Sequence, residues 1–212
     1  MRIVAHASPP DESVRRDRLV QKVADLLHSR HADTLEGVLH IAAIPPRDVA
    51  AAFGDHGALL MAVVTRIADG MLAPLAERPT DASFRQQLVS FARGATDVYS
   101  GLQLRNLYRI ALTDGVHAIR VDFYRHGPAR VRDELARFIR AAQSPARGSQ
   151  LDSRRAAAHF LALLRAYWDM ADVSAVDERP HVDDDLGWLV EVFLTGIETG
   201  THDAHLARPA RN

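Results

Sequence analysis

Apolar residues recur along most of the chain at the three- and four-residue spacings of amphipathic helices, whereas the alternation typical of strands is nearly absent. After a polar lead through Ser13, the first helical pattern carries Leu19, Val23 and Leu27. Two short patterns follow, over 35–42 and 46–53. The sequence therefore predicts an all-α protein with about nine helices.

Turn and capping residues separate these helical patterns. The segment Asp33–Glu36 has the signature of a capping box, with an acidic cap and a glutamate three residues later. Pro45-Pro46 suits a turn followed by the first position of a helix. Asp55 and Asp152 each precede a helical pattern, and we expect both to cap it.

The remaining helices are longer. A helix from Ala58 is expected to end at Pro74, and Gly127-Pro128 is expected to interrupt the chain between two helices. Polar residues after Gly200 are expected to fray. The other patterns cover about 83–99, 103–112, 116–125, 128–142, 153–171 and 186–197.

Composition narrows the class of protein. The chain has 212 residues, 47% of them apolar and 25% charged, as is usual for soluble globular domains. It has no cysteine, which excludes a disulfide framework and a thiolate metal site. No uninterrupted apolar run approaches the 18 or so residues of a membrane span, and the first residues lack the apolar core of a signal peptide. We therefore expect a cytoplasmic protein that does not enter a membrane.

Motifs for catalysis and metal binding are absent from the sequence. It has no His-Glu-x-x-His, glycine-rich phosphate loop or Gly-x-Ser-x-Gly. Two histidine pairs, His28/His31 and His202/His205, have the spacing of ligands on one helical turn, but neither has an evident third ligand. We interpret that spacing as coincidental and expect no catalytic site, no metal and no cofactor, so the protein is not expected to be an enzyme.

Residues 15–64 resemble the N-terminal DNA-binding domain of the TetR family of bacterial regulators. Leu19–Leu27 matches the first helix of that domain and Thr34–Ala42 the second. Ile44–Val49 matches the turn and the start of the recognition helix, and Phe53–Leu60 is similar to the closing Phe-Gly-Ser-Lys-Glu-Ala-Leu-Leu segment. Several polar positions depart from the family: Ala43 replaces Gly, Arg47 a frequent Gly, Ala50 a usual Tyr, and His56 a Lys.

The C-terminal half is similar to one C-terminal subgroup of the same family. The matching segments are Leu104–Arg109, Phe123–Pro128, Phe160–Arg165 and Val192–Gly196. The resemblance implies a homodimer, one recognition helix per subunit and an effector pocket in a C-terminal helical bundle. We accordingly expect a helix-turn-helix domain over 12–57 and a ligand-binding and dimerisation domain over 58–200.

Carried over by position, the resemblance implies DNA-binding roles for Thr34, Arg47, Asp48 and His56. Three arginines lie just before or within the first helix, where we expect them to contact the DNA backbone: Arg15, Arg16 and Arg18. Arg47 can fork to guanine, and Ala51 and Ala52 offer only small apolar contacts suited to a thymine methyl. Residues 1–57, however, hold seven Lys or Arg and eight Asp or Glu, so the segment has no surplus of positive charge for phosphates. Five of the 11 histidines lie there and would add positive charge in mild acid, unless they are ordinary surface histidines.

Candidate effector-binding residues are aromatic and polar side chains on the C-terminal helices. They are Tyr99, Tyr108, Tyr124, His159, Arg165 and Trp168. The alternative is that the aromatic rings fill the core and that His159 and Arg165 pair with acidic side chains.

The helix over 186–197 is apolar nearly all round, which indicates burial on both sides and predicts a second subunit as its cover. The predicted dimer-interface residues are Leu161, Leu164, Trp168, Leu189, Val190, Phe193, Leu194 and Ile197.

The functional prediction is a ligand-responsive transcriptional repressor that binds a palindromic operator in double-stranded DNA as a homodimer, with a small-molecule effector that lowers this affinity. The alternative is a chain of the same fold with a degenerate DNA-reading surface, acting as a ligand-binding or protein-interaction module. A basic face made by Arg15, Arg16, Arg18 and Arg47 would favour the repressor, and acidic residues around Arg47 would favour the alternative.

Overall fold

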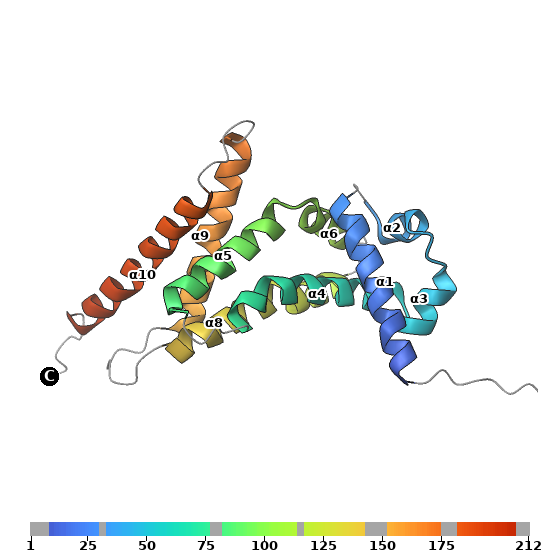
Figure 1. The fold of residues 1–212 in the computed structure, drawn as a ribbon, viewed down its shortest axis with the longest axis horizontal. Coiled ribbons are helices and arrows are strands. Elements are labelled where there is room, and N and C mark those ends of the chain that lie inside the picture. Colours follow the sequence, from blue (N-terminus) through green and yellow to red (C-terminus); the bar gives the residue numbers. More distant parts are fainter. Residues whose placement is uncertain are drawn as a thin grey trace, which may run out of the picture. The chain divides into compact units, whose positions relative to one another are not determined.

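The computed structural model describes residues 9–29, 33–76, 82–113, 117–142, 152–174 and 182–206. Every regular element in these ranges is helical, which confirms the all-α prediction (Figure 1). These ranges contain ten α-helices, close to the expected number, and a π-helical segment, η1 (Arg125–Ala129).

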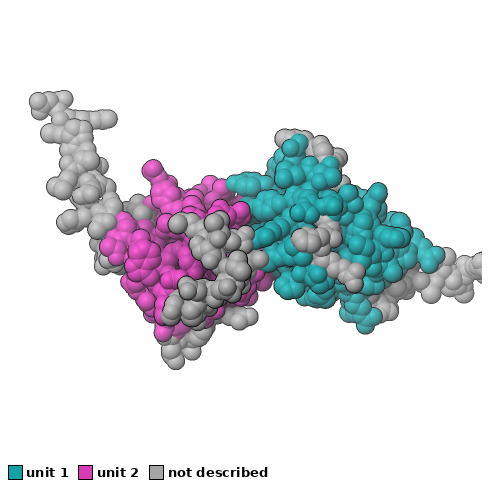
Figure 2. All heavy atoms as spheres, turned by 90° about the horizontal axis from the view of Figure 1, so that it is seen from above, with its two compact units in different colours: residues 1–68, 101–128 teal, residues 69–100, 129–212 magenta. Residues whose placement is uncertain are grey.

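The helices form two compact units, shown in different colours in Figure 2. Unit 1 comprises residues 1–68 and 101–128, and unit 2 comprises residues 69–100 and 129–212. One boundary falls inside a single helix, α4 (His56–Ala76), so both units share this helix. The unit that contains the helix-turn-helix segment therefore extends beyond residues 12–57.

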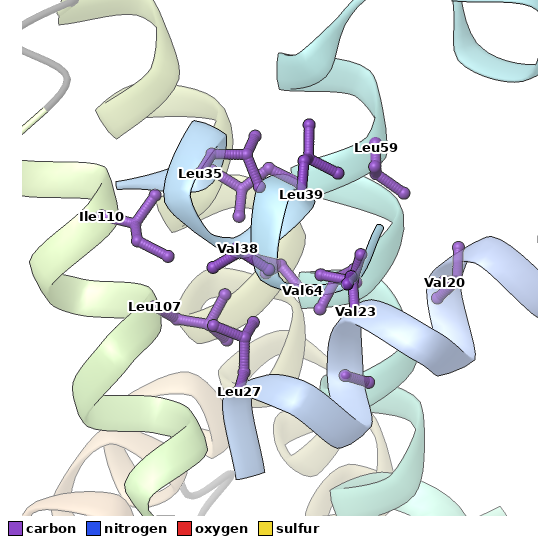
Figure 3. Packing of buried hydrophobic residues seen from close by; sticks show 14 of the residues in the cluster. Val20, Val23, Leu27, Leu35, Val38, Leu39, Leu59, Val64, Leu107 and Ile110 are labelled. Carbon is purple, nitrogen blue, oxygen red and sulfur yellow. The ribbon is translucent and has the colours of Figure 1, made fainter. Parts of the chain in front are cut away.

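Unit 1 is built from the first three helices, the start of α4 and two later helices. Besides α4 they are α1 (Pro9–Ser29), α2 (Leu35–Ile41), α3 (Pro46–Phe53), α6 (Leu102–Thr113) and α7 (His117–Tyr124). Figure 3 shows their shared core, in which Val23 and Leu27 of α1 lie near Val38 of α2 and Leu107 of α6. Because buried aliphatic side chains of α6 pack against those of α1 and α2, α6 is part of the same packed body as the N-terminal helices.

Unit 2 contains the end of α4 and the helices α5 (Phe84–Ser100), α8 (Arg130–Ala142), α9 (Ser153–Ser174) and α10 (Val182–Leu206). Three buried rings form the centre of its core: Phe160 lies 6.2 Å from Phe91 and 4.7 Å from Phe193 between ring centroids. These rings come from α5, α9 and α10, so the core ties the three helices together.

The N-terminus of α2 is capped by a different residue from the one expected. The Thr34 hydroxyl oxygen accepts a hydrogen bond from the Gly37 N–H at 3.1 Å, and Thr34 has the extended backbone of an N-cap. Asp33, the expected acidic cap, instead forms an ion pair with Arg109 at 2.8 Å. Asp33 and Thr34 are both good capping residues, and the start of the helix at Leu35 decides between them.

Two other predicted caps are confirmed. The Asp55 carboxylate accepts from the Ala58 N–H at 2.7 Å, and α4 starts at His56. The Asp152 carboxylate accepts from the N–H groups of Arg154 and Arg155 at 3.0 and 3.2 Å.

Four helix boundaries differ from the prediction, because the flanking residues favour continued helix over the local break. Helix α1 begins at Pro9, inside the expected polar lead, and α4 continues through Pro74. Leu72 and Leu75 on either side of that proline are buried, and their packing offsets its missing hydrogen bond. Gly127-Pro128 lies within η1 rather than at a break, and α10 extends past Gly200 to Leu206.

Helix α4 also has the length and mean hydropathy of a membrane span. Its residues Leu59, Leu60, Val63 and Val64 are buried in the core of unit 1. Because a core helix of a soluble protein shows this combination of apolar composition and burial, we interpret α4 as a core helix.

Candidate functional site

The turn between α2 and α3 is closed by two backbone hydrogen bonds. The Ile44 N–H donates to the Leu39 carbonyl at 2.9 Å, and the Ala43 N–H donates to the His40 carbonyl at 3.0 Å. Leu39 and Ile44 are both buried, so an apolar contact accompanies the bonds. This combination is a Schellman motif, and it fixes the direction in which α3 leaves α2.

Ala43 occupies the left-handed position of this motif, with a φ of 49°. Glycine normally takes this position because it has no Cβ to strain the backbone. The turn therefore keeps the backbone geometry that glycine normally provides, although this chain has alanine there.

Helix α3 presents a short, small-residue face to solvent. Val49 and Ala52 are buried, while Arg47, Ala50 and Ala51 are exposed. The expectation that Ala52 offers a surface contact is therefore wrong, because its side chain packs inward. Within the described residues, Arg47 makes no ion pair, so its guanidinium is available to an external acceptor.

The arginines of α1 reach α3 in two places. The Arg15 guanidinium forms an ion pair with the Asp48 carboxylate, with an N–O distance of 2.9 Å. The Arg16 guanidinium lies over the Phe53 ring, 4.9 Å from its centroid. Both contacts join the first half of α1 to α3, so these arginines lie beside α3 rather than on a separate surface.

The other predicted DNA-binding residues lie at helix ends or on the outer side of α1. Arg18 is exposed on α1, and His56 is a half-buried first residue of α4. The Thr34 oxygen accepts from the Gly37 N–H, which leaves the hydroxyl hydrogen to donate to an acceptor outside the protein.

The histidine hypotheses are only partly covered by the structure. His28 and His40 are exposed, while His6 and His31 lie outside the described residues, as do the side chains of the pair in the C-terminal tail. Among the described residues, no group of three potential metal ligands comes together.

Helix α6 contacts the end of α1 through two amide side chains. The buried Asn106 amide donates to the Leu27 carbonyl at 2.8 Å, and the Gln103 amide donates to the Ala24 carbonyl at 2.9 Å. Leu27 lies in the last turn of α1, where carbonyls have no partner within the helix. The Asn106 amide thus supplies a donor that the helix itself lacks.

Three of the predicted effector-binding residues lie together on α5 and α9. The Arg165 guanidinium stands 5.9 Å from the centroid of the Tyr99 ring and donates to Asp169 at 3.0 Å. The Trp168 indole N–H donates to the Thr96 hydroxyl at 3.2 Å. These side chains therefore already have polar partners within unit 2, as the structural alternative expects.

The structure does not gather the other three at that place. Tyr108 and Tyr124 belong to unit 1 and are 39% and 51% exposed. The Tyr108 ring packs edge-on against Phe123, with 5.1 Å between centroids. His159 is exposed on α9. The structure therefore brings Tyr99, Arg165 and Trp168 together within unit 2 and places Tyr108 and Tyr124 in unit 1.

A cleft of about 540 Å³ lies elsewhere in unit 2, between the second half of α4 and α8. Its apolar lining includes Leu72 and Phe138, and its charged lining includes Asp69 and Arg130, which form an ion pair. None of the predicted effector-binding residues lines it. The sequence analysis missed this cleft because α4 and α8 are far apart in sequence; the only local signal is the strongly amphipathic pattern of α8.

The predicted dimer-interface residues divide by burial. Leu164, Leu189, Val190 and Phe193 are buried inside one chain and offer no surface to a partner, so they belong to the core of unit 2. Leu161, Trp168, Leu194 and Ile197 are half-buried.

The exposed apolar side chains on these helices are different ones. Trp188 and Val192 of α10 are 71% and 43% exposed, and Leu163 of α9 is 38% exposed. One face of α10 is therefore covered by its own chain, and an apolar face remains outside.

A tyrosine near this face has a shifted pKa. The Tyr167 hydroxyl donates to the Asp185 carboxylate at 3.2 Å. Desolvation by burial raises the pKa of Tyr167 above its usual value of 10.0, and the hydrogen bond to Asp185 and the negative charge of that carboxylate raise it further.

Comparisons with known proteins place this geometry in a family. Solved structures match at low sequence identity over most of both chains. A protein described as a TetR-family transcriptional regulator from Mesorhizobium loti is 20% identical, with a TM-score of 0.63 over 87% of this chain and 97% of the other. The flavonoid-responsive regulator FrrA is 19% identical, with a TM-score of 0.62 over 89% and 97%. A regulator from Pseudomonas aeruginosa is 16% identical, with a TM-score of 0.64 over 94% and 96%.

No curated protein sequence matches the chain. A family model does: residues 86–195, more than half of the chain, match the C-terminal domain of AefR-like transcriptional repressors, a TetR-type domain. The solved structures show the same fold, and the sequence match extends from α5 into α10, with α6 to α9 between them. The chain therefore belongs to the TetR family of transcriptional regulators.

Proposed function

We propose that this TetR-family regulator is a repressor that binds a palindromic operator in double-stranded DNA as a homodimer. The observation that carries the proposal is the outward face of α3, on which Arg47 is exposed beside two alanines. A helix with such a face enters the major groove without steric obstruction, and an arginine in its first turn can fork to guanine.

The excess of acidic over basic residues in 1–57 argues less strongly against DNA binding than the count alone suggests. The acidic residue nearest Arg47 in the chain, Asp48, is paired with Arg15 rather than with Arg47. Arg16, Arg18 and Thr34 add donors on the exposed side of unit 1. These observations favour operator binding over the alternative of a DNA-blind module, because acidic groups around Arg47 would have supported that alternative.

We assign dimerisation to the exposed apolar residues of α9 and α10. Trp188, Val192 and Leu163 are large apolar side chains in contact with water, and Trp188 and Val192 lie one turn apart on α10. Exposed apolar surface marks association sites. Trp188→Glu should convert the dimer to a monomer in light scattering at micromolar concentration. Leu112→Glu, which replaces an exposed apolar side chain of α6 in unit 1, is a control for the added charge. A wild-type monomer, or a Trp188→Glu dimer, would contradict this assignment.

The effector is assigned to the 58–200 region, with 12–57 as the DNA-binding region. The cleft between α4 and α8 is the site we favour, and Ala73, a half-buried lining residue, allows a test. In a thermal-shift screen, a compound that stabilises the wild type but not Ala73→Trp binds in the cleft.

The structural similarity to the flavonoid-responsive regulator FrrA supports the proposal that the effector is a small organic molecule. Such a ligand lowers operator affinity only if it binds the two dimer geometries unequally. We place the protein in the cytoplasm, where the operator is.

Arginine variants test operator binding. Arg47→Ala should weaken binding to the selected operator by roughly fivefold to 150-fold and relax base preference at one half-site position. Arg155→Ala, an exposed arginine on α9, should leave binding unchanged. Fluorescence anisotropy on the same duplex compares the two. Equal effects of both substitutions would mean that α3 does not read bases.

A further inference from the structure

The acidic residue on the recognition helix has an unusual setting. The exposed side of α3 holds one hydrogen-bonding donor, Arg47, and two methyl groups, from Ala50 and Ala51. Asp48 follows Arg47 directly and is half-buried, with its side chain 34% exposed. Because Val49 and Ala52 are buried, Asp48 lies at the flank between the buried and exposed sides of the helix.

An unpaired carboxylate at that place would oppose DNA binding, since it would stand beside phosphates. The Arg15 guanidinium lies 2.9 Å from Asp48 Oδ1 and counters its charge. A carboxylate has about four lone-pair sites, so a carboxylate that is paired with an arginine can still accept further hydrogen bonds. Asp48 is therefore held in place, neutralised as a pair, and still able to accept another hydrogen bond.

The remaining capacity of Asp48 defines what it can recognise. In the major groove, a carboxylate can accept from the exocyclic amino group of cytosine, but it has no donor for the acceptor atoms of guanine. Arg47 and Asp48 are consecutive residues of α3, so their side chains leave the helix about 100° apart and reach different bases.

On this basis we propose that Asp48 is a specificity-determining residue that reads a cytosine amino group, with Arg15 as the residue that neutralises and positions it. The inference rests on the proposed operator binding. It assigns to this ion pair a role beyond joining α1 to α3, and it predicts a cytosine in the same half-site as the guanine contacted by Arg47.

Base identity separates this role from a structural one. An asparagine side chain prefers adenine, to which it can both donate and accept. Asp48→Asn should therefore shift the preference at that position from cytosine to adenine, and Asp48→Ala should abolish it. Asp169→Ala, which removes the acid of an exposed arginine–aspartate pair in unit 2, is the matched control and should change no preference.

The experiment is selection of bound duplexes from a random library by each full-length variant, followed by competition binding of four duplexes that differ only at the position in question. For the wild type, cytosine should bind about fivefold to 150-fold more tightly than the other bases. Arg15→Ala should weaken binding to all four duplexes severalfold and reduce the cytosine preference, because Asp48 loses the partner that positions it.

Two results would overturn the proposal for Asp48, and a third would overturn the role given to Arg15. If the Asp48 variants select the wild-type sequence and bind every duplex more tightly, Asp48 acts only as a negative charge. If the wild type enriches no sequence at all, the proposed operator binding fails together with the inference. Higher affinity of Arg15→Ala for all duplexes would contradict the neutralising role of Arg15.

Discussion

Ala43→Gly should stabilise the protein, which is the opposite of what glycine usually does in a helical protein. Ala43 has a φ of 49° and is exposed. An L-residue with a Cβ pays about 1–2 kcal/mol in the left-handed region, because Cβ approaches the following carbonyl oxygen. Glycine removes that cost.

The gain is partly offset in the unfolded chain. Glycine has more conformational freedom there than alanine, which costs about 0.4–1 kcal/mol of stability. The difference predicts a net stabilisation of about 0.8 kcal/mol, or a rise of roughly 2–3 °C in the melting temperature of a chain of this size. The two backbone bonds of the turn, from Ala43 to His40 and from Ile44 to Leu39, are retained.

Urea unfolding followed by far-ultraviolet circular dichroism measures the effect, and Ala51→Gly is the matched control. Ala51 is exposed in the helical part of α3, so glycine there should cost about 1 kcal/mol. The two substitutions are chemically identical and only eight positions apart in the chain, yet they should have opposite signs. Destabilisation of both variants by similar amounts would refute the left-handed conformation of Ala43.

Two further predictions concern buried and titrating groups. Asn106→Ala should lower the free energy of unfolding by about 1–3 kcal/mol, because it removes the donor to the Leu27 carbonyl at the end of α1. Gln103→Ala should lower it by less, because that amide is only partly buried and donates to the Ala24 carbonyl, further inside the helix. Chemical denaturation of both variants checks this, and equal losses would contradict it. The raised pKa of Tyr167 means that its contribution to stability is fully present below pH 10.0 and is lost as the pH rises through its folded-state pKa. Tyr167→Phe should therefore reduce the alkaline loss of stability, which urea unfolding at increasing pH measures. Asp185→Asn should lower the pKa of Tyr167 without restoring its usual value, because burial is the larger cause. Phenolate absorbance during an alkaline titration measures this second effect, and an unchanged titration in Asp185→Asn would contradict the assignment.

Features with local causes could be predicted from the sequence. The all-α class followed from helical periodicity, and the caps at Asp55 and Asp152 followed from the types of residue before each helix. The cap of α2 was assigned to Asp33 instead of Thr34, because two adjacent residues carry the same signal and only the packing of Leu35 fixes where the helix starts. Local signals thus predict that a helix is present more accurately than they predict the residue at which it starts.

Features that depend on which helices meet could not be predicted in this way. Periodicity shows that α10 is apolar on both sides, but not that Val190 faces its own chain while Trp188 faces outward. For the same reason, the sequence does not indicate that Tyr108 belongs to unit 1 and Trp168 to unit 2. The ion pair between Arg15 and Asp48 joins residues 33 positions apart, and no local pattern indicates it.

The most direct test of the account is selection of bound sequences from a random duplex library by the full-length protein, with the enriched duplex then titrated at two salt concentrations. We predict a palindrome whose half-sites are centred about 34 Å apart, one turn of DNA, and an affinity that falls steeply as the salt concentration rises. A well-folded dimer that enriches no sequence, with or without candidate effectors, would contradict operator binding and leave the DNA-blind module as the better account of this chain.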